Sequence, residues 1–323
     1  MKYSVILESS IMQKGLPCTA GSKMLENFIA PVDAAVVERL LAAGVEVKDR
    51  VDTSEFGVGG LLCDEVGSFG KRLTDAVNEF VKGDTDVLLC NDFTGDVSRA
   101  AVSEGLYYIQ PSYGTVSRYG LIASVCSIDQ IGIVCKKPEV GFDVLEIISG
   151  YDSRDGIMVS DGVEKKQAEE PSPCFEIDFA EVKSDYSGVY RQVMQILCAG
   201  EFSNNINRYD GIKFGHRANG YKDLNELYSK SRTEVFGEDV KLAAVVGAMV
   251  LYGDNYERYY NKAMRIRRLI KESLEFDKYD VIVGKCPFLS RICGLPSLSV
   301  PGGYVYSTAA GRGDLLKAVP YGL

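Results

Sequence analysis

The amino-acid sequence predicts an α/β fold. In the first half of the chain, short apolar runs of strand length alternate with segments whose apolar residues recur at helical spacing. The chain has 323 residues, of which 46% are hydrophobic and 25% are charged. This balance is typical of a globular protein with a sizeable buried core.

The first helix of this alternation lies between two strand-like runs. The apolar run from Tyr3 to Leu7 predicts a strand. From Pro31 to Ala43 the apolar residues recur at helical spacing, and Gly44 then provides a stop signal for the helix. The run from Val45 to Val47 follows directly and predicts a second strand.

A second helix and a third strand repeat the pattern. Arg72 to Lys82 predicts a helix that ends at Gly83, and the continuous apolar run Asp86 to Cys90 predicts a buried strand. Farther along, the apolar stretch Leu242 to Tyr252, interrupted by Gly247, predicts a buried helix.

The remainder of the chain is expected to be mostly helical. Tyr186 to Phe202 and Asp223 to Ser273 have helical character, and Val281 to Gly284 predicts a strand. A polar and acidic segment at about 152–173 predicts a surface loop or the trace of an internal deletion.

Charge and the N-terminus limit the possible partners and location. The net charge is -9 and no cluster of Lys and Arg stands out, so direct binding to a nucleic-acid backbone is not expected. The apolar run Val5 to Leu7 is too short for a signal peptide or a membrane span. We therefore expect a cytoplasmic protein without a membrane anchor.

The cysteine and histidine content predicts neither a metal site nor a cofactor. The nine cysteines are scattered, contain no CxxC pair and are expected to be reduced core thiols. His216 is the only histidine, so zinc binding and histidine-dependent nucleophilic catalysis lack their usual residues. The cysteines are Cys18, Cys63, Cys90, Cys126, Cys135, Cys174, Cys198, Cys286 and Cys293.

One long motif resembles a known family. The segment PSYGTVSRYGLIASVCSIDQIG, Pro111 to Gly132, is similar to the PTYG-VSRYGL and SSLDQIGP signature of glutamyl-tRNA(Gln) amidotransferase A subunits, which are members of the amidase signature family. EIISGYDSRD follows at Glu146 to Asp155. Further matching segments occur in the family's order: GSKMLENF, NRYDGIKFGHRA, SRTEVFGEDVK, YYNKAMRIRRLIK and GLPSLSVPGG.

The resemblance implies a fold and a reaction. The fold is a central mixed, twisted sheet covered by helices on both faces, here as a single trimmed domain over residues 1–323. The family reaction is amide hydrolysis, in which a lysine takes a proton from a nucleophilic serine through a second serine held in a cis peptide. Backbone N–H groups of a glycine-rich turn stabilise the oxyanion.

All three catalytic positions differ in this chain. The lysine position falls on Glu8, the relay serine on Arg72 and the nucleophile on Asp96. Thr94 and Gly95 keep part of the glycine-rich turn. The Arg pair that the family uses to hold a substrate carboxylate is also replaced, by Leu242 and Ala243.

These replacements allow several interpretations. Arg72 is expected to hydrogen-bond Glu8, Asp96 or both, which gives a charge-compensated cluster. Alternatively, the two carboxylates form a new acid/base pair or bind a hard metal ion. Asp96 also suits the N-cap of the following helix, and Ser98 would remain an unactivated hydroxyl without the lysine and the relay serine.

A candidate pocket follows from the same alignment. Thr94 and Gly95 belong to it, together with Tyr209, Phe214 and Arg217 of the NRYDGIKFGHRA segment. Aromatic residues at such spacing also occur as ordinary core residues, and that alternative stays open for Tyr209 and Phe214.

Three functions are compatible with the sequence. The first is an amidase-like pseudoenzyme with a binding or regulatory role, whose partner resembles the B or C amidotransferase subunits or is a second copy of the chain. The second is an active amidase or glutamine-dependent amidotransferase subunit with a rebuilt site. The third is a small-molecule sensor that binds without turnover.

Overall fold

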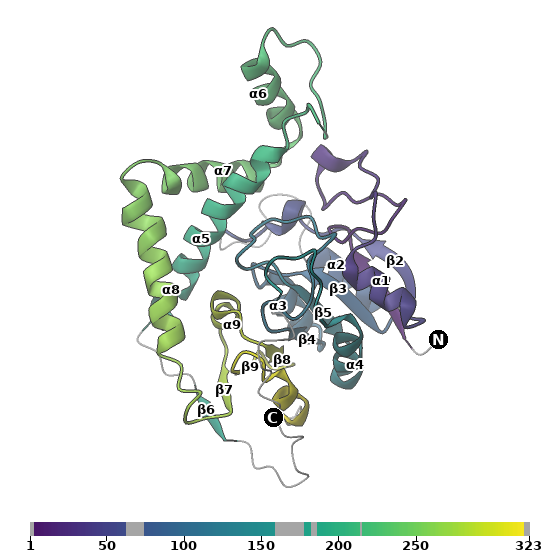
Figure 1. Cartoon of the computed structure of the whole chain (residues 1–323), viewed down its shortest axis with the longest axis vertical. Coiled ribbons are helices and arrows are strands. Elements are labelled where there is room, and N and C mark those ends of the chain that lie inside the picture. Colours follow the sequence, from purple (N-terminus) through teal and green to yellow (C-terminus); the bar gives the residue numbers. More distant parts are fainter. Residues whose placement is uncertain (1–2, 63–73, 159–177, 182–185, 214, 320–323) are drawn as a thin grey trace.

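The computed structural model describes residues 3–62, 74–158, 178–181, 186–213 and 215–319. Within these ranges nine strands form one sheet (Figure 1). The strands are β1 Ser4–Glu8, β2 Glu46–Val51, β3 Val87–Asn91, β4 Tyr107–Gln110, β5 Ile131–Cys135, β6 Phe179–Glu181, β7 Val281–Gly284, β8 Ser297–Ser299 and β9 Val305–Thr308. Their order across the sheet is β2-β1-β3-β5-β4-β8-β9-β7-β6.

Of the α-helices in the described residues, α1 to α4 pack on the sheet, and α5 to α8 form a helical lobe beside it (Figure 1). Their bounds are α1 Ala35–Ala42, α2 Thr74–Lys82, α3 Asp96–Ser103, α4 Pro138–Ile148, α5 Tyr190–Asn205, α6 Leu224–Val235, α7 Glu238–Leu251, α8 Lys262–Glu272 and α9 Phe288–Cys293.

The sheet is mixed, as the resemblance implies. Strand β1 runs parallel to both β2 and β3, whereas β3 pairs antiparallel with β5. The structure confirms four predicted strands, near residues 3–7, 45–47, 86–90 and 281–284. It also confirms the helices predicted near residues 31–43 and 72–82, and the observed ends differ from the predicted ones by a few residues. The predicted α/β class is therefore confirmed.

Helices cover both faces of the sheet because the central strands are apolar on both sides. In β1, Val5 and Leu7 belong to one buried cluster and Ile6 belongs to another. The first cluster contains the apolar residues of α1 and α4, and the second contains those of α2 and α3. A strand buried on both faces has a continuous apolar sequence rather than an alternating one, which is what β1 and β3 show.

The helical lobe packs through a third cluster that includes residues of α5, α7 and α9. Helices α5 and α7 approach so closely that a β-carbon added to Gly247 would lie 1.9 Å from the carbonyl oxygen of Ala199. The prediction that the stretch Leu242 to Tyr252 is a buried helix is wrong in one respect. It is mostly helical, but Val245 is 67% exposed and Tyr252 is 79% exposed.

The described cysteines are all free thiols, as predicted. Most of them are buried, but Cys126 is exposed, so it departs from the expected core position. Cys63 and Cys174 lie outside the described residues. Among the residues that can be described, none of the helices combines the length and the apolar character needed to cross a bilayer.

Candidate functional site

Two of the three predicted catalytic positions, Glu8 and Asp96, lie at or just after the carboxyl ends of adjacent strands. Glu8 is the last residue of β1, and Asn91 is the last residue of the parallel neighbour β3. The loop after β3 leads into α3, whose first residue is Asp96. The carboxyl ends of adjacent parallel strands commonly form binding sites in α/β proteins. Arg72 and Phe214 lie outside the described residues.

Glu8 is buried and held on both carboxylate oxygens. The residue is only 2% exposed. Oε1 accepts a hydrogen bond of 2.9 Å from the Ser10 hydroxyl, and Oε2 accepts one of 2.6 Å from the backbone N–H of Asn91. Burial raises the pKa of Glu8 from its ordinary 4.5 to about 7, and the nearby Asp92 and Asp129 carboxylates add to the increase.

Asp129 extends this network into the signature segment. It is 1% exposed, and its Oδ1 accepts a hydrogen bond of 2.9 Å from the Asn91 side-chain amide. Its Oδ2 accepts from the backbone N–H groups of Ser124 and Val125, each at 2.9 Å. Burial raises the pKa of Asp129 despite these three donors. Asn91 therefore bridges the two buried carboxyl groups.

A buried ion pair lies beside the start of α3. Arg291 is 2% exposed, and its guanidinium pairs with the carboxylate of Asp92. The same guanidinium donates to the Asp92 carbonyl at 2.7 Å, to the Pro287 carbonyl at 2.7 Å and to the Ser98 hydroxyl at 2.9 Å. Nothing in the sequence pattern points to Arg291, because it lies 199 residues from Asp92.

The helix cap differs from the prediction. Gly95 is the N-cap residue, with a φ of 81°, and Asp96 is the first residue inside α3. The carboxylate of Asp92 accepts hydrogen bonds from the N–H groups of Val97 and Ser98, at 3.1 and 2.9 Å. The prediction that Asp96 caps α3 is therefore wrong, since Asp92 bonds the free N–H groups and a left-handed glycine makes the turn.

Ser98 is not positioned as a nucleophile. Its hydroxyl donates to the Gly95 carbonyl at 3.0 Å and accepts from Arg291. A guanidinium has donors only and cannot remove a proton from a hydroxyl. Ser98 thus fits the expectation that it lacks an activating base.

Asp96 and the glycine-rich turn are buried beside a small cavity. Asp96 is 9% exposed and forms an ion pair with Arg99, one turn farther along α3. Thr94 is 5% exposed, and its hydroxyl has no hydrogen-bond partner among the described residues. The adjoining cavity, lined by Gly60, Thr94 and Arg99 among others, has a volume of about 10 Å³. This is about the space that one water molecule needs.

The described contacts of the other candidate pocket residues are with aromatic and polar neighbours. Tyr209 is 4% exposed and stacks on Phe56, with ring centroids 5.1 Å apart. Arg217 contacts the Tyr221 ring and hydroxyl. His216 forms a 2.7 Å contact with Glu234. Ligand contact by Tyr209 or Arg217 stays a prediction.

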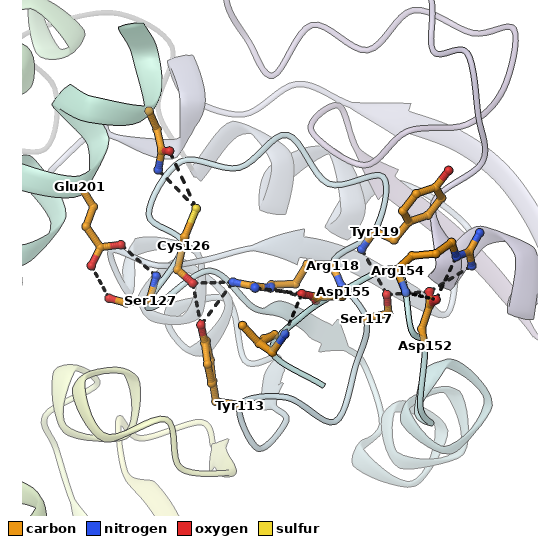
Figure 2. A network of polar contacts seen from close by, with 12 residues as sticks. Tyr113, Ser117, Arg118, Tyr119, Cys126, Ser127, Asp152, Arg154, Asp155 and Glu201 are labelled. Carbon is orange, nitrogen blue, oxygen red and sulfur yellow. Dashed lines mark hydrogen bonds and ion pairs between the residues drawn. The ribbon is translucent and has the colours of Figure 1, made fainter. Parts of the chain in front are cut away.

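The signature segment forms a polar network, which Figure 2 shows. The Arg118 guanidinium bonds both oxygens of Asp155, at 3.1 and 3.0 Å, and also contacts the Cys126 carbonyl. Ser117 donates to Asp152 at 2.9 Å. The motif that carries the resemblance therefore holds the segment near residue 118 against the segment near residue 155, and its role here is structural.

Comparison with known proteins defines the class. Residues 175–288 match the family model described as Amidase. The matched region contains neither Glu8 nor Asp96. The fold is similar to that of the native peptide amidase from Stenotrophomonas maltophilia, with a TM-score of 0.73 and 19% identity, over 98% of this chain and 80% of that chain.

Two curated relatives make the relationship more specific. The chain is 33% identical to the A subunit of glutamyl-tRNA(Gln) amidotransferase from Wolinella succinogenes, over 87% of this chain and 71% of the relative. It is 29% identical to the corresponding protein of Lachnoclostridium phytofermentans, over 99% of this chain and 78% of the relative. The chain belongs to the amidase family, as a relative of the glutamyl-tRNA(Gln) amidotransferase A subunits.

Proposed function

We propose that this chain is an amidase-family protein that has lost amide hydrolysis and acts by binding, in a structural or regulatory role. The observation that carries the proposal is Glu8. It stands where the resemblance places the catalytic lysine, and both of its oxygens are already bound by Ser10 and Asn91. A carboxyl group in that state does not replace a neutral lysine in a serine relay.

The surroundings of Glu8 support the same proposal. Asp96, at the nucleophile position, is engaged with Arg99, and the hydroxyl of Ser98 is engaged with Arg291. Among the described residues, the cavity beside Thr94 has room for about one water molecule, which is too little for a glutamine side chain. The expected cluster of Arg72 with Glu8 and Asp96 remains part of the proposal. In such a cluster Arg72 would compete with the described partners of the two carboxylates.

The proposed partners follow from the relatives. These are named as one subunit of an amidotransferase, so we expect this chain to bind a protein similar to the B or C amidotransferase subunits, or a second copy of itself. Its net charge of -9 agrees with leaving nucleic-acid contacts to other proteins. We place this role in the cytoplasm.

An ammonia-release assay tests the loss of hydrolysis. The purified full-length chain is incubated with glutamine, asparagine and a peptide amide, beside an active amidase as positive control. We expect no ammonia above the buffer blank. Release that disappears in Glu8→Gln or Asp96→Ala, with the circular dichroism spectrum unchanged, would overturn the proposal.

One observation favours a second candidate, an amidase with a rebuilt site. A carboxyl group with a pKa of about 7 is suited to general acid/base catalysis near neutral pH. If Glu8 acts as a base, the rate rises with pH through about 7, because only the ionised carboxylate accepts a proton. A measured rate that is independent of pH between 5 and 9, or is retained in Glu8→Gln, excludes this role for Glu8.

A further inference from the structure

Helix α7 has two apolar faces, and only one of them is covered by the described residues. The inner face, Val240, Ala243, Gly247 and Val250, is buried. The opposite side carries Leu242, Val245 and Met249, which are 41%, 67% and 49% exposed. We call these residues, together with Tyr252 just after the end of the helix, the outer face; Tyr252 is 79% exposed. A helix that is apolar all round is normally buried all round.

The outer face continues into exposed tyrosines. A π-helix, Tyr256–Asn261, joins α7 to α8, and it leaves Tyr256 43% and Tyr259 37% exposed. Figure 1 shows α7 and α8 meeting at an outer corner of the helical lobe, on the side away from the sheet. Tyr and Met are enriched in protein interfaces, and tyrosines frequently dominate their binding energy. Single-turn π-helices also occur frequently at functional sites.

Helix α8 adds positive charge to the same corner. Five of its eleven residues are basic and one is acidic, in a chain whose net charge is -9. Arg265 is paired with Glu257 at 3.7 Å and Arg268 with Glu272 at 2.7 Å, but all four side chains are more than half exposed. Such exposed pairs are weak and leave the cations available to a partner.

We propose that the outer face of α7 and the exposed Arg265 and Arg268 of α8 together dock an acidic amphipathic helix of a partner protein. Apolar residues of that helix would cover Val245, Met249 and Tyr252. Its carboxylates would pair with these two exposed arginines. This inference rests on the proposed binding role and adds to it the surface and the chemistry of the partner.

Other occupants fit less well. A two-fold contact between copies of this chain would face the same patch toward itself and bring two basic α8 helices together. A uniformly anionic surface, such as a membrane or a nucleic acid, would meet the acidic side chains of Asp254 and Glu257 at the corner. A protein helix can place its carboxylates only where the arginines lie.

Site-specific photo-crosslinking identifies the occupant. The photoreactive residue p-benzoylphenylalanine replaces Tyr252 in the full-length chain in its native host, and a parallel chain carries it at Leu224, which is 58% exposed on α6. We expect a crosslink from position 252 only, to a protein segment with apolar residues at helical spacing and a net negative charge.

A synthetic peptide of the crosslinked segment then measures the contact. Fluorescence anisotropy gives its affinity for the purified chain. We expect Val245→Arg and Arg268→Glu each to weaken binding by about tenfold or more. Lys278→Glu changes the net charge by a similar amount but lies outside the proposed surface, so it should leave the affinity nearly unchanged. Replacing with lysine only the acidic peptide residue that faces position 268 should restore binding to Arg268→Glu.

Several results would overturn the docking proposal. These are the absence of a crosslink at position 252, crosslinks only to lipid or to copies of this chain, a crosslinked segment without net negative charge, and a peptide affinity that Val245→Arg does not change. The ammonia assay reads a different property. If the chain hydrolyses amides and also binds the peptide, only the proposed function is wrong. If it releases no ammonia and does not bind the peptide, only the docking proposal is wrong.

Discussion

The site at the carboxyl ends of β1 and β3, here called the sheet edge, and the helical lobe differ in which residues they bury. At the sheet edge, charged groups that are costly to bury are buried, and Glu8, Asp92, Asp129 and Arg291 all have partners within the chain. On the lobe, apolar residues that favour burial are exposed on the outer face of α7. These four charged groups of the first region have partners within the chain, whereas the apolar outer face of the second is the surface that we propose a partner covers.

The largest loss of stability is expected when a buried charged group loses its partner. Arg291→Ala leaves the buried Asp92 carboxylate without its cation, and loss of one partner of a buried pair costs about 3–5 kcal/mol of the free energy of unfolding. Urea denaturation measures the loss. Arg265→Ala, at a side chain 73% exposed, is the matched control and should cost less than about 0.5 kcal/mol.

A double variant separates the charge from the packing. Replacing both partners, as in Asp92→Asn with Arg291→Met, removes the unpaired charge and keeps an acceptor for the N–H groups of α3. It should be more stable than Arg291→Ala. If Arg291→Ala costs less than about 1 kcal/mol, the pair is not the constraint that its burial indicates.

The next effect concerns pH. The folded-state pKa of Glu8, about 7, lies above its ordinary 4.5. The folded state therefore holds a proton that the unfolded state releases as the pH rises from 4.5. Stability that is present below the ordinary pKa is lost as the pH approaches the folded-state value, by roughly 3 kcal/mol in total.

Glu8→Gln makes this dependence measurable, because the amide imitates the neutral carboxyl group. Urea denaturation at about pH 4, 5.5 and 8 should show the original chain losing stability relative to Glu8→Gln over that range, with little further change at higher pH. Parallel curves for the two proteins would show that Glu8 ionises as readily when folded as when unfolded.

A smaller effect tests the inner face of α7. Gly247→Ala adds a β-carbon that meets the Ala199 carbonyl at 1.9 Å, so α5 and α7 must separate. Overpacking of this kind costs about 1–3 kcal/mol, although alanine is the better helix former. Thermal and urea denaturation measure it. Gly188→Ala, with no atom within 4 Å of its added β-carbon, is the control, and equal effects at both positions would contradict the close packing.

The sequence predicts the parts of this molecule that depend on neighbours along the chain. Periodicity locates β1, β3, α1 and α2, because a strand buried on both faces and an amphipathic helix each have a local pattern. The amidase resemblance adds the sheet type and the positions of Glu8 and Asp96. In the structure Glu8 is the last residue of β1, and Asp96 begins α3 after the neighbouring strand β3.

The parts that the sequence does not predict depend on contacts between distant segments. Arg291 reaches Asp92 across 199 residues, and no local pattern indicates which buried arginine meets which carboxylate. Residue type favours Asp96 as the cap of α3, whereas the chain turns at Gly95 and uses Asp92 instead. Apolar composition predicts burial of α7 but does not show that another molecule is needed to cover one face.

The smallest change in stability is expected on the outer face of α7. It gives the most direct comparison between a face that the chain covers and a face that it leaves exposed. Val245→Arg places a charge on a side chain already 67% exposed, so the free energy of unfolding should change by less than about 0.5 kcal/mol. Val250→Arg makes the same change on the inner face, at a residue 2% exposed, and should cost at least about 3 kcal/mol because an unpaired charge is buried. Urea denaturation of the two variants compares the faces with residue type held constant. A large loss for Val245→Arg would mean that the outer face already contributes to the folded chain, and the case for a partner helix there would fail with it.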